Sequence, residues 1–190
     1  LKNKAICGTN TDGEGFVASL EHSHPAFRVE NKTAIVIGAG GAAKAIVGAL
    51  LDGKAEKIGI INRTGSRTQN LQKLFGPRVF EITGANAKNE LKKCKLLVNT
   101  TSLGMEGQPP LEQDIGSLNP GALVADIVYT PLESAFLQRA RGHGNPTVGG
   151  LGMLLHQAVR GFELWFGVRP EVTAELYELV AADVRKVKKQ

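Results

Sequence analysis

The sequence predicts an α/β protein with a doubly wound, mostly parallel sheet of about six strands and helices on both faces. Short apolar runs alternate with segments of helical periodicity along almost all of the 190 residues, and this alternation implies right-handed βαβ crossovers. The run Thr33–Ile37 is apolar nearly throughout and leads into glycines. Such a run is expected of a strand buried on both faces of a parallel sheet.

The expected elements follow in chain order. The first helix covers residues 12–22, where Thr11 and Glu14 have the spacing of a capping box. Strands are expected at residues 33–37, 57–61, 78–82, 95–98, 122–125 and 146–148. Helices are expected at residues 41–52, 65–75, 86–93, 131–141, 151–165 and 170–187. Pro170 suits the first position of the last helix. Its apolar side chains recur at helical spacing, namely Val172, Leu176, Leu179, Val180, Val184 and Val187.

Composition places the chain among ordinary globular domains. Hydrophobic residues make up 42% and charged residues 22%, and no apolar run approaches the ~20 residues that span a bilayer. The net charge of +5 comes mostly from Arg185, Lys186, Lys188 and Lys189, and aromatic residues are only 5% of the chain. We therefore expect no nucleic-acid partner and no membrane contact, and the first residues lack the pattern of a signal peptide.

The cysteines and histidines offer no metal site. Cys7 and Cys94 are far apart and form no C-x-x-C motif, so we expect two reduced thiols in a cytoplasmic protein. His22 and His24 lie in a polar stretch that ends at Pro25, and we expect a surface loop there rather than a pair of metal ligands.

A glycine-rich turn follows the first strand. The chain has 23 glycines and only 8 prolines, which favours tight turns and close approach of the backbone to a ligand over flexible linkers. The turn fits the pattern G-x-G-x-x-A and consists of Gly38, Ala39, Gly40, Gly41, Ala42 and Ala43. Because it follows a strand and opens a helix, it predicts that a dinucleotide pyrophosphate binds at the helix N-terminus. A turn that serves only packing is the alternative.

The residues after the second strand bear on the choice of cofactor. A site for NAD places Asp or Glu there to bind the ribose 2′-hydroxyl. The chain instead has Asn62, Arg63, Thr64, Gly65, Ser66 and Arg67, with no acidic residue. Guanidinium groups bind phosphate through charge-assisted hydrogen bonds, so the sequence predicts NADP(H).

Six islands of sequence, in order, resemble the shikimate dehydrogenases of the shikimate/quinate dehydrogenase family. The two most specific are Asn-Thr-Thr-Ser-Leu-Gly-Met at residues 99–105 and Gly-Leu-Gly-Met-Leu at residues 150–154, the latter with Gln157. The other four are residues 10–13, the turn at 38–42, residues 62–64 with Arg67, and residues 126–129 with Pro131. Together they span nearly the whole chain.

The resemblance implies a Rossmann-like fold and the reversible, NADPH-dependent reduction of 3-dehydroshikimate to shikimate in aromatic amino-acid biosynthesis. It makes Asp12 the carboxylate of a catalytic Lys–Asp pair, and it makes Asp12, Tyr129 and Gln157 substrate ligands. It assigns to the cofactor the glycine turn, residues 62–64 with Arg67, and also Asn99, Thr100, Thr101, Ser102, Ile127, Gly150 and Met153. Taken alone, Asp12 is a good N-cap, Gln157 an ordinary polar helix residue, Tyr129 a half-buried aromatic and Met153 a packing residue.

The chain departs from the family in length. Members carry a first domain that holds the catalytic lysine and a Ser-x-Ser segment for the substrate carboxylate, and neither can be assigned here. We therefore expect residues 1–190 to be one NADP-binding domain, with residues 1–25 as the junction to an absent substrate domain and 150–190 as closing helices. By itself this chain would be inactive. A smaller departure is Gly149, where many members have Asp.

Two other functions stay open. One is a quinate or aminoshikimate dehydrogenase of the same family. The other is a non-catalytic NADP(H)-binding or sensing module, against which the presence of Asp12, Tyr129 and Gln157 argues. The oligomeric state is also open, with a homodimer as one candidate.

Overall fold

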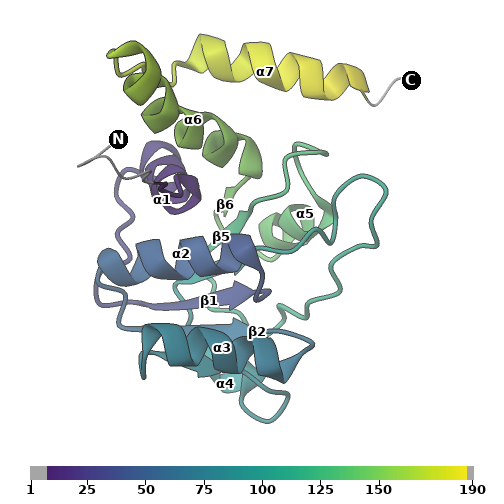
Figure 1. Cartoon of the computed structure of the whole chain (residues 1–190). Helices are drawn as coiled ribbons and strands as arrows, with labels where there is room; N and C mark the ends of the chain where they lie inside the picture. Colours follow the sequence, from purple (N-terminus) through teal and green to yellow (C-terminus); the bar gives the residue numbers. More distant parts are fainter. Residues whose placement is uncertain (1–7, 188–190) are drawn as a thin grey trace, which may run out of the picture.

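The computed structural model describes residues 8–187 and contains a single six-stranded sheet (Figure 1). Its strands are β1 (Thr33–Ile37), β2 (Lys57–Ile61), β3 (Val79–Glu81), β4 (Leu96–Asn99), β5 (Leu123–Asp126) and β6 (Thr147–Val148). They lie in the order β3-β2-β1-β4-β5-β6, and every neighbouring pair is parallel. This is the doubly wound order in which the direction of winding reverses between β1 and β4.

Helices cover both faces of this sheet. They are α1 (Asp12–Ser23), α2 (Gly41–Asp52), α3 (Gly65–Phe75), α4 (Ala87–Lys93), α5 (Ala135–Gly142), α6 (Gly150–Phe166) and α7 (Ala174–Val187). The predicted fold class is thus confirmed. Figure 1 shows α1 between α2 and α6, with α7 at the far end of α6.

Two hydrophobic clusters lie on opposite faces of the sheet, and alternate residues of each strand belong to one or the other. Ala34 and Val36 of β1 belong to a cluster that includes Ile46 of α2, Phe16 of α1 and Met153 of α6. Ile35 and Ile37 belong to the opposite cluster, which α4 and α5 complete through Leu91, Phe136 and Leu137. Successive side chains of a strand point to opposite faces, so one continuous apolar run serves both clusters.

Three expectations about helix starts were wrong. The helix expected at 131–141 begins only at Ala135, because the Ser134 side chain caps it by accepting a hydrogen bond from the Leu137 amide (3.3 Å). The last helix begins at Ala174, with Thr173 Oγ1 accepting from the Leu176 amide (3.2 Å), so Pro170 lies outside it. Thr11 precedes α1 but makes no side-chain cap, so the expected capping box does not form.

Other boundaries agree with the sequence to within one or two residues. His22 belongs to the last turn of α1 instead of a loop.

Cys94 is a buried free thiol, and burial raises its pKa to about 12. Cys7, Lys188 and Lys189 lie outside the described residues. Within residues 8–187, no helix is long and apolar enough to cross a membrane.

Candidate functional site

The candidate site lies at the carboxyl ends of the strands, next to the reversal between β1 and β4. In open α/β sheets, ligands bind in the crevice at this point. The loops that follow β1, β2, β4, β5 and β6 all leave the same edge because the strands are parallel. This edge therefore gathers the five islands that lie at or after the end of a strand, at residues 38–42, 62–64, 99–105, 126–129 and 150–154.

Gly38 makes the turn after β1. Its φ is +107°, and a Cβ there would lie 2.7 Å from Thr100 Oγ1 and 2.9 Å from Thr101 Cγ2. Its amide donates to the Ile61 carbonyl (2.8 Å), which ties the turn to the end of β2. Only glycine satisfies both the backbone angle and the space at this position.

The next glycines face open space. A Cβ on Gly40 or Gly41 would meet nothing within 4 Å. Gly40 is the N-cap of α2 and makes no side-chain cap, and the first amides of a helix have no partner within it. Bare amides at a helix N-terminus, with no side chains in front of them, fit a pyrophosphate.

The turn after β2 is basic and exposed. Arg63, Thr64 and Arg67 are all exposed, and neither arginine forms an ion pair within residues 8–187. Asn62 Nδ2 donates to the Thr64 carbonyl (2.8 Å) and shapes the turn into α3. The two guanidinium groups thus flank a helix N-terminus, which fits a phosphate.

The loop after β4 is held by its own buried side chains. Thr100 Oγ1 donates to the Ile37 carbonyl (2.7 Å), and Asn99 Oδ1 accepts from Thr101 Oγ1 (2.8 Å). Asn99 and Thr100 are buried, whereas Ser102 is exposed. The structure therefore gives Asn99, Thr100 and Thr101 side chains a part in shaping the crevice, and only Ser102 presents an exposed side chain there.

Asp126 is the centre of this framework. Its Oδ1 accepts from Asn99 Nδ2 (2.9 Å) and from the Val128 amide (3.0 Å), and its Oδ2 accepts from Ser134 Oγ (2.6 Å). Burial raises the pKa of Asp126, and the three donors partly offset that shift. Sequence reasoning gave Asp126 no role, although an acid that ends a fully apolar strand is a signal of such a buried network.

Asp12 and Gln157 lie on α1 and α6, two helices that pack against each other. Asp12 is the first residue of α1, and its amide donates to Asn10 Oδ1 (2.8 Å), while Asn10 Nδ2 donates to Asp12 Oδ2 (3.3 Å). A Cβ on Gly15 would lie 2.6 Å from the Gln157 amide nitrogen, so the two helices touch there. This contact places Gln157 within one helical turn of Asp12. Asp12 forms no ion pair with any described residue.

The loop after β5 meets the start of α6. Gly150 packs directly on the Ile127 carbonyl, where any Cβ would overlap, and its amide donates to the Val128 carbonyl (3.2 Å). Tyr129, next along that loop, is 40% exposed. Met153 is buried in the core, which agrees with the packing interpretation of that residue.

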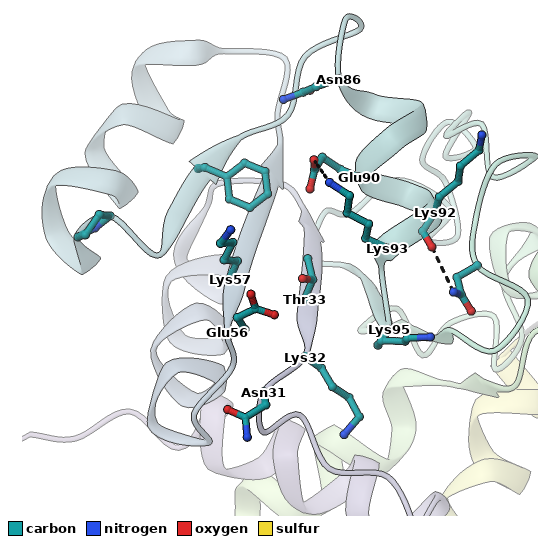
Figure 2. Close-up of a pocket in the computed structure, with 13 residues that line it drawn as sticks. Asn31, Lys32, Thr33, Glu56, Lys57, Asn86, Glu90, Lys92, Lys93 and Lys95 are labelled. Carbon is teal, nitrogen blue, oxygen red and sulfur yellow. Dashed lines mark hydrogen bonds and ion pairs between the residues drawn. The ribbon is translucent and has the colours of Figure 1, made fainter.

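A large hollow, of about 890 Å³, lies away from this edge of the sheet. It lies at the amino ends of the strands, where Thr33, Lys57 and Lys95 begin or precede β1, β2 and β4. Figure 2 shows its lysines interspersed with Glu56 and Glu90, and Lys93 Nζ is 3.5 Å from Glu90 Oε1. Five lysines and two glutamates line this hollow, which is therefore net positive, but none of the site residues predicted from the sequence lines it.

Histidines also meet outside the crevice. The ring centroids of His22 on α1 and His156 on α6 are 5.3 Å apart. Desolvation and the neighbouring His22 lower the pKa of His156. Among the residues described, no three side chains of His, Cys, Asp or Glu gather as metal ligands.

Two protein-family models match separate stretches of this chain. The family model of shikimate / quinate 5-dehydrogenase matches residues 21–104, and that of the shikimate 5′-dehydrogenase C-terminal domain matches residues 150–174. The shikimate dehydrogenase (NADP(+)) of Rhodopseudomonas palustris strain HaA2 is 54% identical over 176 residues, which are 93% of this chain and 62% of that protein. The chain belongs to the shikimate/quinate dehydrogenase family.

Solved structures of the shikimate/quinate dehydrogenase family match the fold as well. The quinate dehydrogenase of Corynebacterium glutamicum, in complex with NAD, aligns with a TM-score of 0.81 at 29% identity, over 92% of this chain and 63% of that one. The shikimate 5-dehydrogenase of Thermus thermophilus, in complex with NADP(H) and shikimate, aligns with a TM-score of 0.78 at 29% identity, over 93% and 63%. The chain thus spans less than two thirds of the length of these relatives.

Proposed function

We propose that this chain is the NADP(H)-binding part of a shikimate dehydrogenase, which reduces 3-dehydroshikimate reversibly to shikimate. The observation that carries the proposal is that Arg63 and Arg67, at the start of α3, form no ion pair within residues 8–187 and lie beside a glycine turn with room for a pyrophosphate. The curated relative at 54% identity bears the same function in its name. We also propose that this protein is cytoplasmic. The buried Cys94 is a free thiol, and thiols stay reduced in the cytoplasm.

Different residues at the carboxyl ends of the strands would bind different parts of the cofactor. The amides that open α2 would bind the pyrophosphate, since a helix N-terminus attracts anions. Arg63, Thr64 and Arg67 would hold the 2′-phosphate of the adenosine ribose. Ile127 and Gly150 would contact the nicotinamide end. Bound there, NADPH supplies the hydride.

The substrate would lie between α1, α6 and the loop after β5. Asp12 would accept a hydrogen bond from the substrate hydroxyl and take part in its proton exchange as a general base or acid. Gln157 would bind a second hydroxyl, and Tyr129 would cover the reacting carbon. The catalytic lysine and the residues that bind the substrate carboxylate would come from the rest of the whole protein, so the 190 residues alone should turn over very slowly.

The cofactor assignment can be tested by binding alone. We expect the protein to bind NADPH more tightly than NADH, and Arg63→Ala to weaken NADPH binding by about 10-fold because a charge-assisted hydrogen bond is lost. NADH binding should change little. The measurement is calorimetric titration of both cofactors, with Lys57→Ala at the opposite edge as the control for loss of one positive charge.

A variant Arg63→Ala that still prefers NADPH to the same degree would remove Arg63 from this role. If wild type binds neither cofactor, the proposal itself fails.

Quinate is the second candidate substrate, because a quinate dehydrogenase has a TM-score of 0.81 against this chain. Shikimate and quinate differ at the ring carbons, so the choice depends on groups that touch the ring. The whole protein should oxidise shikimate faster than quinate at equal concentration. The reverse order, measured as cofactor reduction at about 340 nm under otherwise equal conditions, would favour the alternative.

A further inference from the structure

An acidic side chain lies at the start of α3 although none follows β2 in the sequence. Strand β3 pairs with β2 in parallel, with Ile60 opposite Glu81. Glu81 Oε1 lies 3.2 Å from the place that a Cβ on Gly65 would take, and Gly65 is the first residue of α3. The neighbouring strand thus brings a carboxylate to the turn that contains Arg63, Thr64 and Arg67.

The charged side chains at this turn, Glu81, Arg63 and Arg67, do not form ion pairs with one another. Glu81 is half-buried, and its carboxylate makes no ion pair or side-chain hydrogen bond within residues 8–187. Arg63 and Arg67 are likewise without ion pairs in that range. A purely structural glutamate would be expected to bond the first amides of α3 or one of these arginines. The positive end of the α3 dipole favours a negative charge at this position.

We propose that Glu81 is a specificity residue that limits the preference of this site for NADPH over NADH. The inference deepens the proposed function and rests on it. A 2′-phosphate would carry close to two negative charges at pH 7 and would meet the same helix N-terminus that Glu81 already faces. The carboxylate therefore opposes the phosphate. A ribose 2′-hydroxyl is a hydrogen-bond donor, and an acidic side chain near it is the usual arrangement of NAD sites.

Removal of the charge tests this inference. Glu81→Gln keeps the shape and an acceptor oxygen, so we expect NADPH to bind about 5-fold more tightly while NADH binding changes less than about 2-fold. Glu81→Lys should strengthen NADPH binding further. The gain should shrink as salt is raised from 0.05 M to 0.5 M, because ions screen the repulsion.

The control is Glu56→Gln, which removes one negative charge at the amino ends of the strands, in the hollow of Figure 2. It should leave the ratio of the two dissociation constants unchanged. Both constants are measured by calorimetry, and thermal melts verify that each variant is folded.

The outcomes separate this inference from the proposed function. If wild type prefers NADPH and Arg63→Ala reduces that preference while Glu81→Gln leaves it unchanged, the role of Glu81 is overturned and the proposed function stands. If wild type binds neither cofactor, both are overturned. If Glu81→Gln gains affinity for NADPH and Glu56→Gln does not, the role of Glu81 is supported. If Glu56→Gln gains equally, the gain is an effect of net charge, and the role of Glu81 is contradicted.

Discussion

At the residue scale, Asp126 holds the crevice together at an electrostatic cost. Its two oxygens accept hydrogen bonds from Asn99, Val128 and Ser134, which fix the ends of β4 and β5 and the start of α5. Burial nevertheless raises its pKa. The folded protein therefore holds the Asp126 proton more tightly than the unfolded chain does.

This predicts a stability difference that depends on pH. The contribution of Asp126 to the free energy of unfolding is fully present below the pKa of an unfolded aspartate, about 3.9, and is lost as pH rises through the raised folded pKa. Asp126→Asn does not titrate, and its amide can still accept from Asn99 and Val128. The variant should therefore gain in stability relative to wild type as pH rises from 4 to 8, as measured by urea unfolding.

The control is Asp52→Asn, an exposed carboxylate at the end of α2. The difference in free energy of unfolding between Asp52→Asn and wild type should not show the rise between pH 4 and 8 that is expected for Asp126→Asn. A constant difference between Asp126→Asn and wild type at every pH would contradict the assignment.

At the element scale, glycines inside α1 let it lie against two other helices. A Cβ on Gly13 would be 2.7 Å from the Ala45 carbonyl oxygen of α2, and one on Gly15 would be 2.6 Å from the Gln157 nitrogen of α6. Glycine inside a helix costs about 1 kcal/mol relative to alanine, so its presence indicates close packing. The contact sets where Asp12 and Gln157 stand relative to each other.

Gly15→Ala should push α1 and α6 apart. The atoms in the way are the backbone N and Cα of Gln157 and its Cβ, which cannot turn aside, and overpacking of this kind costs about 1–3 kcal/mol. We expect the free energy of unfolding to fall by that amount and the binding of shikimate by the whole protein to weaken. Chemical unfolding and substrate titration measure the two effects.

Gly161→Ala is the matched control. It lies in α6 with nothing within 4 Å of its Cβ position, so the same substitution should leave stability unchanged or raise it by up to about 1 kcal/mol. If both variants behaved alike, the close approach at Gly15 would not be the reason for its glycine.

At the scale of the whole molecule, the far end of α6 and the face of α7 expose apolar side chains. Trp165 is 81% exposed, and the others are Phe162, Leu164, Phe166, Val168, Leu176 and Leu179. A contiguous exposed apolar surface usually marks an interface. We propose that the rest of the whole protein covers this surface.

Trp165 is the single tryptophan of the chain and reports on this surface. In the 190-residue chain its fluorescence should resemble that of free tryptophan in water and be readily quenched by acrylamide. In the whole protein the emission should shift to shorter wavelength and quenching should fall by about half or more, because apolar contacts exclude water. An emission that is identical in both forms would contradict the covering of this surface.

The order of the elements could be predicted from the sequence because the signal is local. An apolar run of five residues followed by glycines specifies a buried strand and a phosphate-type turn, and β1 and α2 have the expected bounds. The helix starts at Ala135 and Ala174 were harder to predict, because a cap depends on which side chain accepts from a free amide. Gly38 and Arg63 became candidates through local backbone geometry and charge, whereas Asp12 and Gln157 became candidates only through the resemblance to a known family.

The fold class, the glycine turn and the basic start of α3 could be predicted from the sequence, because all three depend on neighbours along the chain. The packing of the folded chain was needed to see that Asn99 and Thr100 support the crevice with buried side chains, and that Gly15 sets the distance between α1 and α6. It also placed Glu81 beside Gly65, where the sequence had no acid to offer after β2. The physical reason is that parallel pairing and helix packing join residues that are far apart in sequence, and charge and steric contact act through space.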